Sequence, residues 1–261
     1  MVFRNVRLSQ SLLLALAPLF SASATRAQGV EGTPVVPGLT IYINQGVRPD
    51  TVVFQRWITR NGKDSSAGAR TVITRAIIDR PGPHLVEIAQ RFPNVGGEIV
   101  DTAIDELHTL RAVAHSSHQP TRTMLFEFKG DAAEGTVAFR RPTGDSVINV
   151  HQELGGGVFD SNVIDLVVGE LPLAPNYSVS LPFFLYERGG RVMTPVKVRE
   201  KTSVPFARLG EREVWVVDVG VPGAPATVWV DTRTHTVLRI RYDIAARGTS
   251  FTDERVTPLR G

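Results

Sequence analysis

The sequence predicts a mostly β domain, in which one large antiparallel sheet is accompanied by one short helix. Three observations lead to this fold class. Short extended runs follow one another about every ten residues, with turn residues between them. Several runs alternate apolar and polar residues with a period of two, as strands with one buried and one exposed face do. The pattern lacks the long helices that would join parallel strands.

Fifteen runs are expected to form strands because they are extended, rich in β-branched or aromatic residues, and bounded by turn residues. They lie near residues 39–44, 51–59, 71–79, 84–90, 98–105, 107–114, 121–128, 135–140, 146–153, 177–186, 191–201, 213–219, 226–231, 236–245 and 250–256.

Two of these runs show the alternation clearly. In residues 236–245, one face is expected to carry Leu238, Ile240, Tyr242 and Ile244. In residues 121–128, one face is expected to carry Met124, Phe126 and Phe128. Since a strand places successive side chains on opposite faces, each set is expected to point into the core.

Turn chemistry supports hairpins between the runs. Asn61-Gly62 is a strong signal for a tight turn, and Pro222-Gly223-Ala224-Pro225 separates the run with Trp215 from the run with Trp229. Residues 230–235 are expected to form another hairpin turn, in which the Asp231 side chain accepts hydrogen bonds from backbone N–H groups.

One segment predicts a helix. After Gly155-Gly156-Gly157, either Asp160 or Ser161 can cap a helix over Ser161–Glu170, and Pro172 stops it. The glycines before the helix lack the Lys-Ser/Thr of a phosphate-binding loop and the G-x-G-x-x-G of a dinucleotide site. They are therefore interpreted as a flexible turn.

The N-terminal residues 1–27 are expected to be a secretory signal. Arg4 and Arg7 precede an apolar run over Leu12–Phe20, and small residues before Ala24 or Ala27 offer a cleavage site. The apolar run is about half as long as a membrane span requires. Residues 28–37 are expected to be a flexible lead-in and residues 38–261 a single antiparallel β domain. The expected location is the periplasm or cell envelope.

Charge and cysteine content exclude several classes of function. Without the three arginines of residues 1–27, the 29 basic and 26 acidic side chains become 26 and 26, so the remaining chain is neutral. A neutral chain has no long-range attraction for nucleic acid, and no nucleic-acid partner is expected. The absence of cysteine excludes disulfides, thiol chemistry, thiolate metal sites and a lipidated N-terminal cysteine. No cofactor is expected.

Histidines offer the best candidate for a hydrolytic or metal site. His115-Ser116-Ser117-His118 is the densest pair, but residues three apart on a strand face opposite sides, and no third ligand has fixed spacing. We interpret this segment as a polar loop between strands. His108 and His151 lie in strand-like runs and are expected to be structural.

Other catalytic signatures are incomplete. No G-x-S-x-G is present, although the members of a triad need not be close in sequence. Asp231-Thr232 and Asp160-Ser161 match only half of the aspartic-protease signature, because Arg233 and Asn162 stand where glycine is required. The sequence therefore predicts no catalytic or metal-binding residue, and the protein is expected not to be an enzyme.

Large aromatic residues gather in the second half of the chain. Two interpretations remain: they fill the core, or they line an apolar cavity on the concave face of a sheet that curls around the helix. In the second case the residues expected to bind a lipophilic ligand are Phe126, Phe128, Phe139, Phe159, Phe184, Trp215 and Trp229, with Phe183 in the same group.

A series of short motifs runs through the chain from Asp105 onward. Asp105–Arg111 (DELHTLR) is followed by Leu125–Phe128 (LFEF) and Glu134–Val137 (EGTV). The expected helix then ends in Leu171–Leu173 (LPL), and Val228–Arg239 (VWVDTRTHTVLR) closes the series.

This order resembles that of secreted bacterial families of unknown function in the superfamily of lipoprotein carriers and outer-membrane lipoprotein-sorting proteins. The resemblance covers residues 102–255 and departs where Ala112-Val113 replaces the usual proline. It implies a large curved antiparallel sheet, or half-barrel, with one short helix on its concave side. Relatives with known roles carry acyl chains or lipoproteins, an analogy that rests on fold alone.

Three hypotheses about function follow. The first is an exported, non-enzymatic envelope protein that binds a lipid or another lipophilic small molecule in the curved sheet. The second is an interaction or scaffold domain, with a filled core, that binds another envelope protein. The third is an unrecognised hydrolase with His115 and His118 as its best candidate site.

Overall fold

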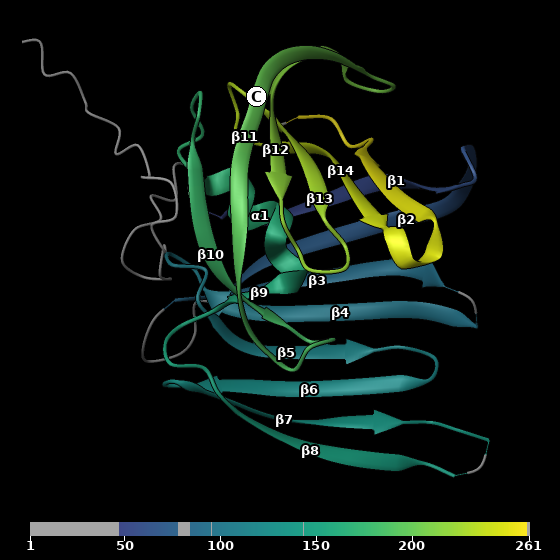
Figure 1. The fold of residues 1–261 in the computed structure, drawn as a ribbon, viewed down its shortest axis with the longest axis vertical. Helices are drawn as coiled ribbons and strands as arrows, with labels where there is room; N and C mark the ends of the chain where they lie inside the picture. The colour runs from purple at the N-terminus through teal and green to yellow at the C-terminus, as the bar shows by residue number, and fades with distance from the viewer. Residues whose placement is uncertain (1–46, 78–83, 95, 143, 260–261) are drawn as a thin grey trace, which may run out of the picture.

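A computed structural model describes residues 47–77, 84–94, 96–142 and 144–259 (Figure 1). Fifteen strands form one sheet in the order β8-β7-β6-β5-β4-β3-β2-β1-β15-β14-β13-β12-β11-β10-β9. The strands are β1 (Asp50–Arg60), β2 (Lys63–Ile77), β3 (Leu85–Asn94), β4 (Gly97–Glu106), β5 (Ala112–His118), β6 (Arg122–Lys129), β7 (Ala132–Phe139), β8 (Ser146–Glu153), β9 (Phe159–Asp160), β10 (Ser178–Leu185), β11 (Gly190–Phe206), β12 (Gly210–Val219), β13 (Ala226–Asp231), β14 (Val237–Ile244) and β15 (Thr249–Arg255).

The predicted fold class is confirmed. Neighbouring strands are antiparallel, as the alternation predicts, except that the two-residue strand β9 runs parallel to β10. Strands β1 and β15 pair in the middle of the sheet and join its two halves. In Figure 1, β3–β8 run nearly crosswise to β10–β13, with α1 (Ile164–Glu170) between the two halves. The sheet is thus strongly curved and does not close into a barrel.

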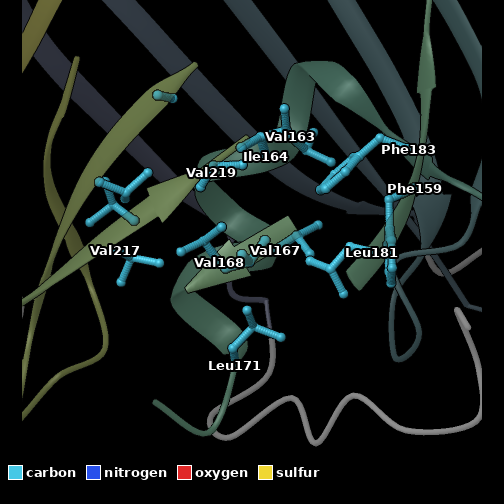
Figure 2. Packing of buried hydrophobic residues seen from close by; sticks show 14 of the residues in the cluster. Phe159, Val163, Ile164, Val167, Val168, Leu171, Leu181, Phe183, Val217 and Val219 are labelled. Atoms are coloured by element: carbon cyan, nitrogen blue, oxygen red, sulfur yellow. The ribbon is translucent and has the colours of Figure 1, made fainter. Parts of the chain in front are cut away.

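The concave side of the sheet is filled by the helix and the side chains around it. Val163, Val167 and Val168 are fully buried in a core that also takes residues from β3, β10, β12 and β13. Figure 2 shows Val217 of β12 on one side of the helix and Phe183 of β10 on the other. The helix therefore replaces the hollow interior that a curved sheet would otherwise enclose.

The predicted helix and its cap are confirmed with one refinement. A 3₁₀ turn, η1 (Ser161–Val163), precedes α1, and the Asp160 side chain accepts a hydrogen bond from the backbone N–H of Asn162. Of the two candidate caps, Asp160 is therefore the one that satisfies an N–H group left free by the first turn. The helix ends at Glu170, two residues before Pro172.

The predicted hairpin turns are also present. Asn61 and Gly62 both have positive φ, as a tight two-residue turn requires. Residues 220–225 separate β12 from β13. The Asp231 carboxylate accepts hydrogen bonds from the backbone N–H groups of Arg233 and Thr234, both at 2.9 Å.

Two predictions about β5 are wrong. The segment from His115 to His118 is not a loop but the second half of β5, and the predicted strand over residues 107–114 begins instead as a turn at Leu107. Leu110 has a positive φ of 52°, which breaks the extended run and delays the strand to Ala112. The polar residues of β5 favour an exposed loop in the sequence, but some of them are buried in the structure.

The predicted common face of β14 is also wrong at one position. The register of β13 and β14 shifts between Trp229 and Val230, which leaves Leu238 as the extra residue of a bulge. Because a bulge changes the side to which the following residues point, Leu238 joins a cluster with Phe206, whereas Ile240 joins the main core. Alternation alone cannot show such an insertion.

Several expectations lie outside the described residues. They are the secretory signal over residues 1–27, the lead-in over residues 28–37 and the strand near residues 39–44. Within the described ranges, no helix is long and apolar enough to cross a lipid bilayer.

We expect Gly169→Ala to destabilise the protein, although alanine favours helices by about 1 kcal/mol over glycine. A Cβ at position 169 would lie 2.8 Å from the backbone oxygen of His235, so the helix or the following hairpin must move. Urea denaturation followed by circular dichroism measures the change. A variant as stable as the parent protein would show that α1 is not held against residues 231–235.

Candidate functional site

A buried histidine–aspartate pair lies between β5 and the start of the helical segment. The Nδ1 atom of His115 is 2.9 Å from Oδ2 of Asp160, and both side chains are inaccessible to solvent. The Tyr186 hydroxyl donates to the same carboxylate oxygen at 2.8 Å, and the Asn162 N–H donates to Oδ1 at 2.8 Å. Three groups from different parts of the chain therefore converge on Asp160.

The remaining contacts of His115 fix its ring. Its Nε2 atom lies 3.4 Å from Nδ2 of Asn162, and the ring stacks on Tyr186 with a centroid distance of 4.0 Å. Since the Asn162 amide donates to Nε2, the proton of a neutral ring belongs on Nδ1, where it reaches Asp160. Burial raises the pKa of the Tyr186 phenol well above its usual value, so Tyr186 acts as a hydrogen-bond donor.

Asp105 on β4 is the unusual member of this group. Its side chain is fully buried, and neither carboxyl oxygen has a hydrogen-bond partner among the described residues. Burial, together with the nearby carboxylate of Asp160, raises the pKa of Asp105 well above its usual value. Burial also raises the pKa of Asp101, which lies on the same face of β4. A protonated Asp105 avoids placing a second bare charge beside Asp160.

A second buried network lies on the other side of the helix start. The guanidinium of Arg70 pairs with Asp165 at 2.7 Å and with Asp253 at 3.1 Å. Arg56 forms two further bonds to Asp253, at 2.7 and 2.8 Å. Burial lowers the pKa of Arg70, but the two carboxylates outweigh it and the net shift is upward, so Arg70 stays charged. Gln90 accepts from Arg70 at 3.1 Å.

The two networks meet at the segment that leads into α1. Gln90 donates to the backbone oxygen of Asn162, whose side chain contacts His115. We call the two hydrogen-bonded networks together the polar tether; its members are Arg56, Arg70, Gln90, His115, Asp160, Asn162, Asp165, Tyr186 and Asp253. Asp105 lies beside the tether without a hydrogen bond to it. The tether fixes residues 160–165 to strands of both halves of the sheet.

The chemistry of the polar tether is structural. A hydrolytic triad needs a hydroxyl at the free histidine nitrogen, but Nε2 of His115 meets the Asn162 amide instead. The His115 side chain has no exposed surface through which a substrate could reach it. Within the part of the chain that the structure describes, no group of three His, Asp or Glu side chains is arranged to hold a metal ion.

The other histidines do not join His115. His118 is exposed and lies three residues along β5, so it faces the opposite side of the strand. His151 is exposed on β8 and contacts Glu153 at 3.1 Å. His108 lies in the exposed turn before β5 and not in a strand. The structure therefore does not bring together the His115 and His118 pair of the hydrolase hypothesis.

The structure distributes the predicted ligand-binding aromatic residues over several places. Phe126, Phe128 and Phe184 pack together, with centroid distances of 5.4 and 5.2 Å from the Phe184 ring. Phe159 belongs to the main core, where it contacts Phe183. The others lie elsewhere: Trp215 at the margin of the main core, Trp229 against the cluster of Phe206, and Phe139 beneath the guanidinium of Arg141.

One of these residues lines a partly open cavity. A cavity of about 240 Å³ lies where β3, β5 and β6 meet the turn before β9, and Phe128 forms part of its wall. Its other walls are Leu85, Ala112, Val113, Gly130, Leu154, Gly157 and Val158, with Glu106 and Arg111 as its charged residues. We call it the Phe128 cavity. Phe126 borders a wider and more open groove of about 500 Å³ along β4–β7, which also includes Leu125 and Thr136.

Comparison with protein families assigns the chain. The sequence profile of the family described as "Protein of unknown function (DUF3108)" matches residues 69–253. The chain belongs to the DUF3108 family. The expectation of a family without an assigned role is thereby confirmed. No curated protein matches the chain.

Three solved structures are similar to this DUF3108 protein at low sequence identity. A β-barrel-like DUF1849 protein from Brucella abortus is 12% identical, with a TM-score of 0.37, over 80% of this chain and 96% of that one. A Bacteroides fragilis protein with a YmcC-like fold is 8% identical, with a TM-score of 0.30, over 80% and 95%. A DUF1329 protein from Desulfovibrio piger is 9% identical, with a TM-score of 0.28, over 79% and 84%.

Sequence reasoning missed the polar tether. Asp160 was recognised as a helix cap, but no local pattern links it to His115, which lies 45 residues earlier. Arg56 and Asp253 are 197 residues apart. The signal that the sequence offers is the alternation of β4, which places Asp101 and Asp105 on the same face as the apolar Ile99 and Ala103.

We expect Asp105→Leu to stabilise the protein at pH 7 by about 1–3 kcal/mol, because leucine needs no proton or hydrogen-bond partner in this site. The raised pKa means that the native state binds the Asp105 proton more tightly than the unfolded chain. The parent protein should therefore lose stability as the pH rises from the unfolded pKa of about 4 towards the native value. The variant should lack this loss.

Urea denaturation at several pH values measures both effects. Asp160→Leu is the matched control, because it removes the acceptor of three donors and should destabilise the protein at every pH. If Asp105→Leu destabilises the protein at pH 7, the assignment of Asp105 as a neutral, unpartnered acid is contradicted.

We expect Arg70→Met to cost about 3–5 kcal/mol, because it leaves two buried carboxylates without their shared cation. Arg199→Met is the matched control. Arg199 pairs with Asp218 on the exposed face, where an ion pair contributes about 1 kcal/mol or less. Chemical denaturation of both variants measures the difference, and equal losses would show that the Arg70 network does not tether the helix segment.

Proposed function

We propose that this DUF3108 protein is an exported, non-catalytic envelope protein that binds a small lipophilic group in the Phe128 cavity. The cavity carries this proposal. Its walls are mostly apolar, and its charged residues, Glu106 and Arg111, form an ion pair with each other. This combination of apolar walls with few polar groups is typical of small-molecule sites.

The size of the cavity limits the ligand. About 240 Å³ is below the usual range for drug-sized ligands, so it suits a short acyl chain or a single ring rather than a whole lipid. The filled concave side supports this restriction, because α1 and its neighbours occupy the space that a larger lipid would need.

The non-catalytic part of the proposal is supported by the polar tether. Its histidine is buried between a carboxylate and an amide, without a nucleophile or a path for substrate. The export part is supported by the sequence pattern of residues 1–27.

The first test is native mass spectrometry of the freshly purified protein, followed by extraction with organic solvent. A bound mass that solvent releases is the expected result. A mass equal to that of the polypeptide, with nothing extractable, counts against the proposal.

We expect Val113→Trp to abolish binding of a medium-chain fatty acid, because the larger side chain would occupy the Phe128 cavity. Thr136→Trp is the matched control, since it makes the same enlargement in the open groove. Isothermal titration calorimetry with the fatty acid compares the two. Loss of binding only in Thr136→Trp would move the ligand to the groove, and unchanged binding in Val113→Trp would exclude the cavity.

A second candidate function is an envelope scaffold, favoured by the filled concave core. A pull-down from envelope extract distinguishes it from the first, because one stoichiometric protein partner without any lipid supports the scaffold.

A further inference from the structure

The two edge strands of the sheet differ in length. At one end, β9 has only two residues, and a very short edge strand offers little for another chain to pair with. At the other end, β8 is eight residues long and pairs with β7 in an uninterrupted register. Within the described ranges, no strand lies on its other side.

Strand β8 also lacks the features that usually protect an edge. Its sequence, SVINVHQE, contains no proline, lysine or glycine, and it has no bulge. Val147 and Ile148 are 64% and 53% exposed, although both are large and apolar. A long, regular edge of this kind pairs readily with a further strand.

Hydrogen bonding shows which backbone groups this edge offers. The N–H of Leu154, just after β8, donates to the oxygen of Asp131 next to β7. In an antiparallel pair, bonded residues alternate along a strand, so the even-numbered residues of β8 point their backbone groups towards β7. The odd-numbered residues Val147, Asn149, His151 and Glu153 therefore point their N–H and C=O groups outward.

We propose that the β8 edge binds the β8 edge of a second copy, in an antiparallel pair centred on Val150. In this register Val147 pairs with Glu153 of the second copy and Asn149 pairs with His151. The odd-numbered residues of both copies then form about eight backbone hydrogen bonds. Within the described residues, the outward C=O of Glu153 also accepts a hydrogen bond from the Gln152 side chain at 2.9 Å.

The charges of β8 are compatible with a second copy of the same strand in this register. A shift of two residues in one direction places Asp145 opposite Glu153, and like charges directly opposite one another destabilise a sheet. A shift in the other direction places His151 opposite His151 and shortens the ladder. In the proposed register no carboxylate faces another, and the Val150 side chains meet at the centre.

Analytical ultracentrifugation of the protein without residues 1–27, the expected secretory signal, tests the proposal. We expect a concentration-dependent dimer, and Asn149→Pro should weaken the dissociation constant about tenfold or more, because proline removes an outward N–H. An edge position tolerates proline within the single chain. Asn149→Thr keeps the N–H and should still dimerise. Val147→Lys, which places a charge on the edge, is a second disrupting variant if Asn149→Pro does not fold.

A disulfide tests the register. The parent protein has no cysteine, so a single introduced thiol can pair only between copies. Facing Cα atoms in this non-hydrogen-bonded position lie about 4.5 Å apart, within disulfide range. Val150→Cys should thus form a covalent dimer on mild oxidation. The Cα atoms of the two residues at position 148 would be about 13 Å apart, so Ile148→Cys should not form a covalent dimer.

A parent protein that sediments as a monomer up to about 1 mM overturns the proposal, because an interface that weak has no role at ordinary concentrations. A dimer that Asn149→Pro and Val147→Lys leave intact also overturns it, since another surface must then hold the copies together. Covalent dimerisation of Ile148→Cys and not of Val150→Cys excludes the proposed register.

Discussion

The position of one seven-residue helix depends on polar side chains buried at its start. A helix this short is not stable alone in water, and its apolar face does not by itself fix where along the sheet it lies. Asp160, Asn162 and Asp165 fix the position of the helix along the sheet. They contact β5 on one side and reach β2 and β3 on the other. The filled concave side follows from this attachment.

Such an arrangement has a direct consequence for function. In a curved sheet with an empty interior, a greasy ligand would enter the concave side. Here Val163, Val167 and Leu171 already occupy it, and the Phe128 cavity lies instead near the start of β3 and the turn before β9. A ligand in the Phe128 cavity, as proposed, would lie at the margin of the fold rather than at its centre. The same sealing keeps His115 away from any substrate.

Much of the fold could be predicted from the sequence, because its strongest signals are local. The strand over Ser146–Glu153 has the predicted bounds, and the cap at Asp160 and the turn at Asn61-Gly62 follow from side-chain and backbone chemistry within a few residues. The position of Leu238 could not be predicted, since a bulge depends on how two strands pair. His115 was misassigned for a related reason: its partner lies in another part of the chain, so its polarity suggested exposure.

The pairing of β1 with β15 has a consequence for how the chain acquires its structure. These strands are neighbours in the sheet although Arg56 and Asp253 are 197 residues apart. Within each half of the sheet, neighbouring strands follow one another in sequence, whereas the seam requires β1 to pair with β15. Closure over such a separation is slow, because loop entropy is lost before the contacts form. A chain without residues 249–255 would leave β1 without β15, and the two halves of the sheet would stay unjoined.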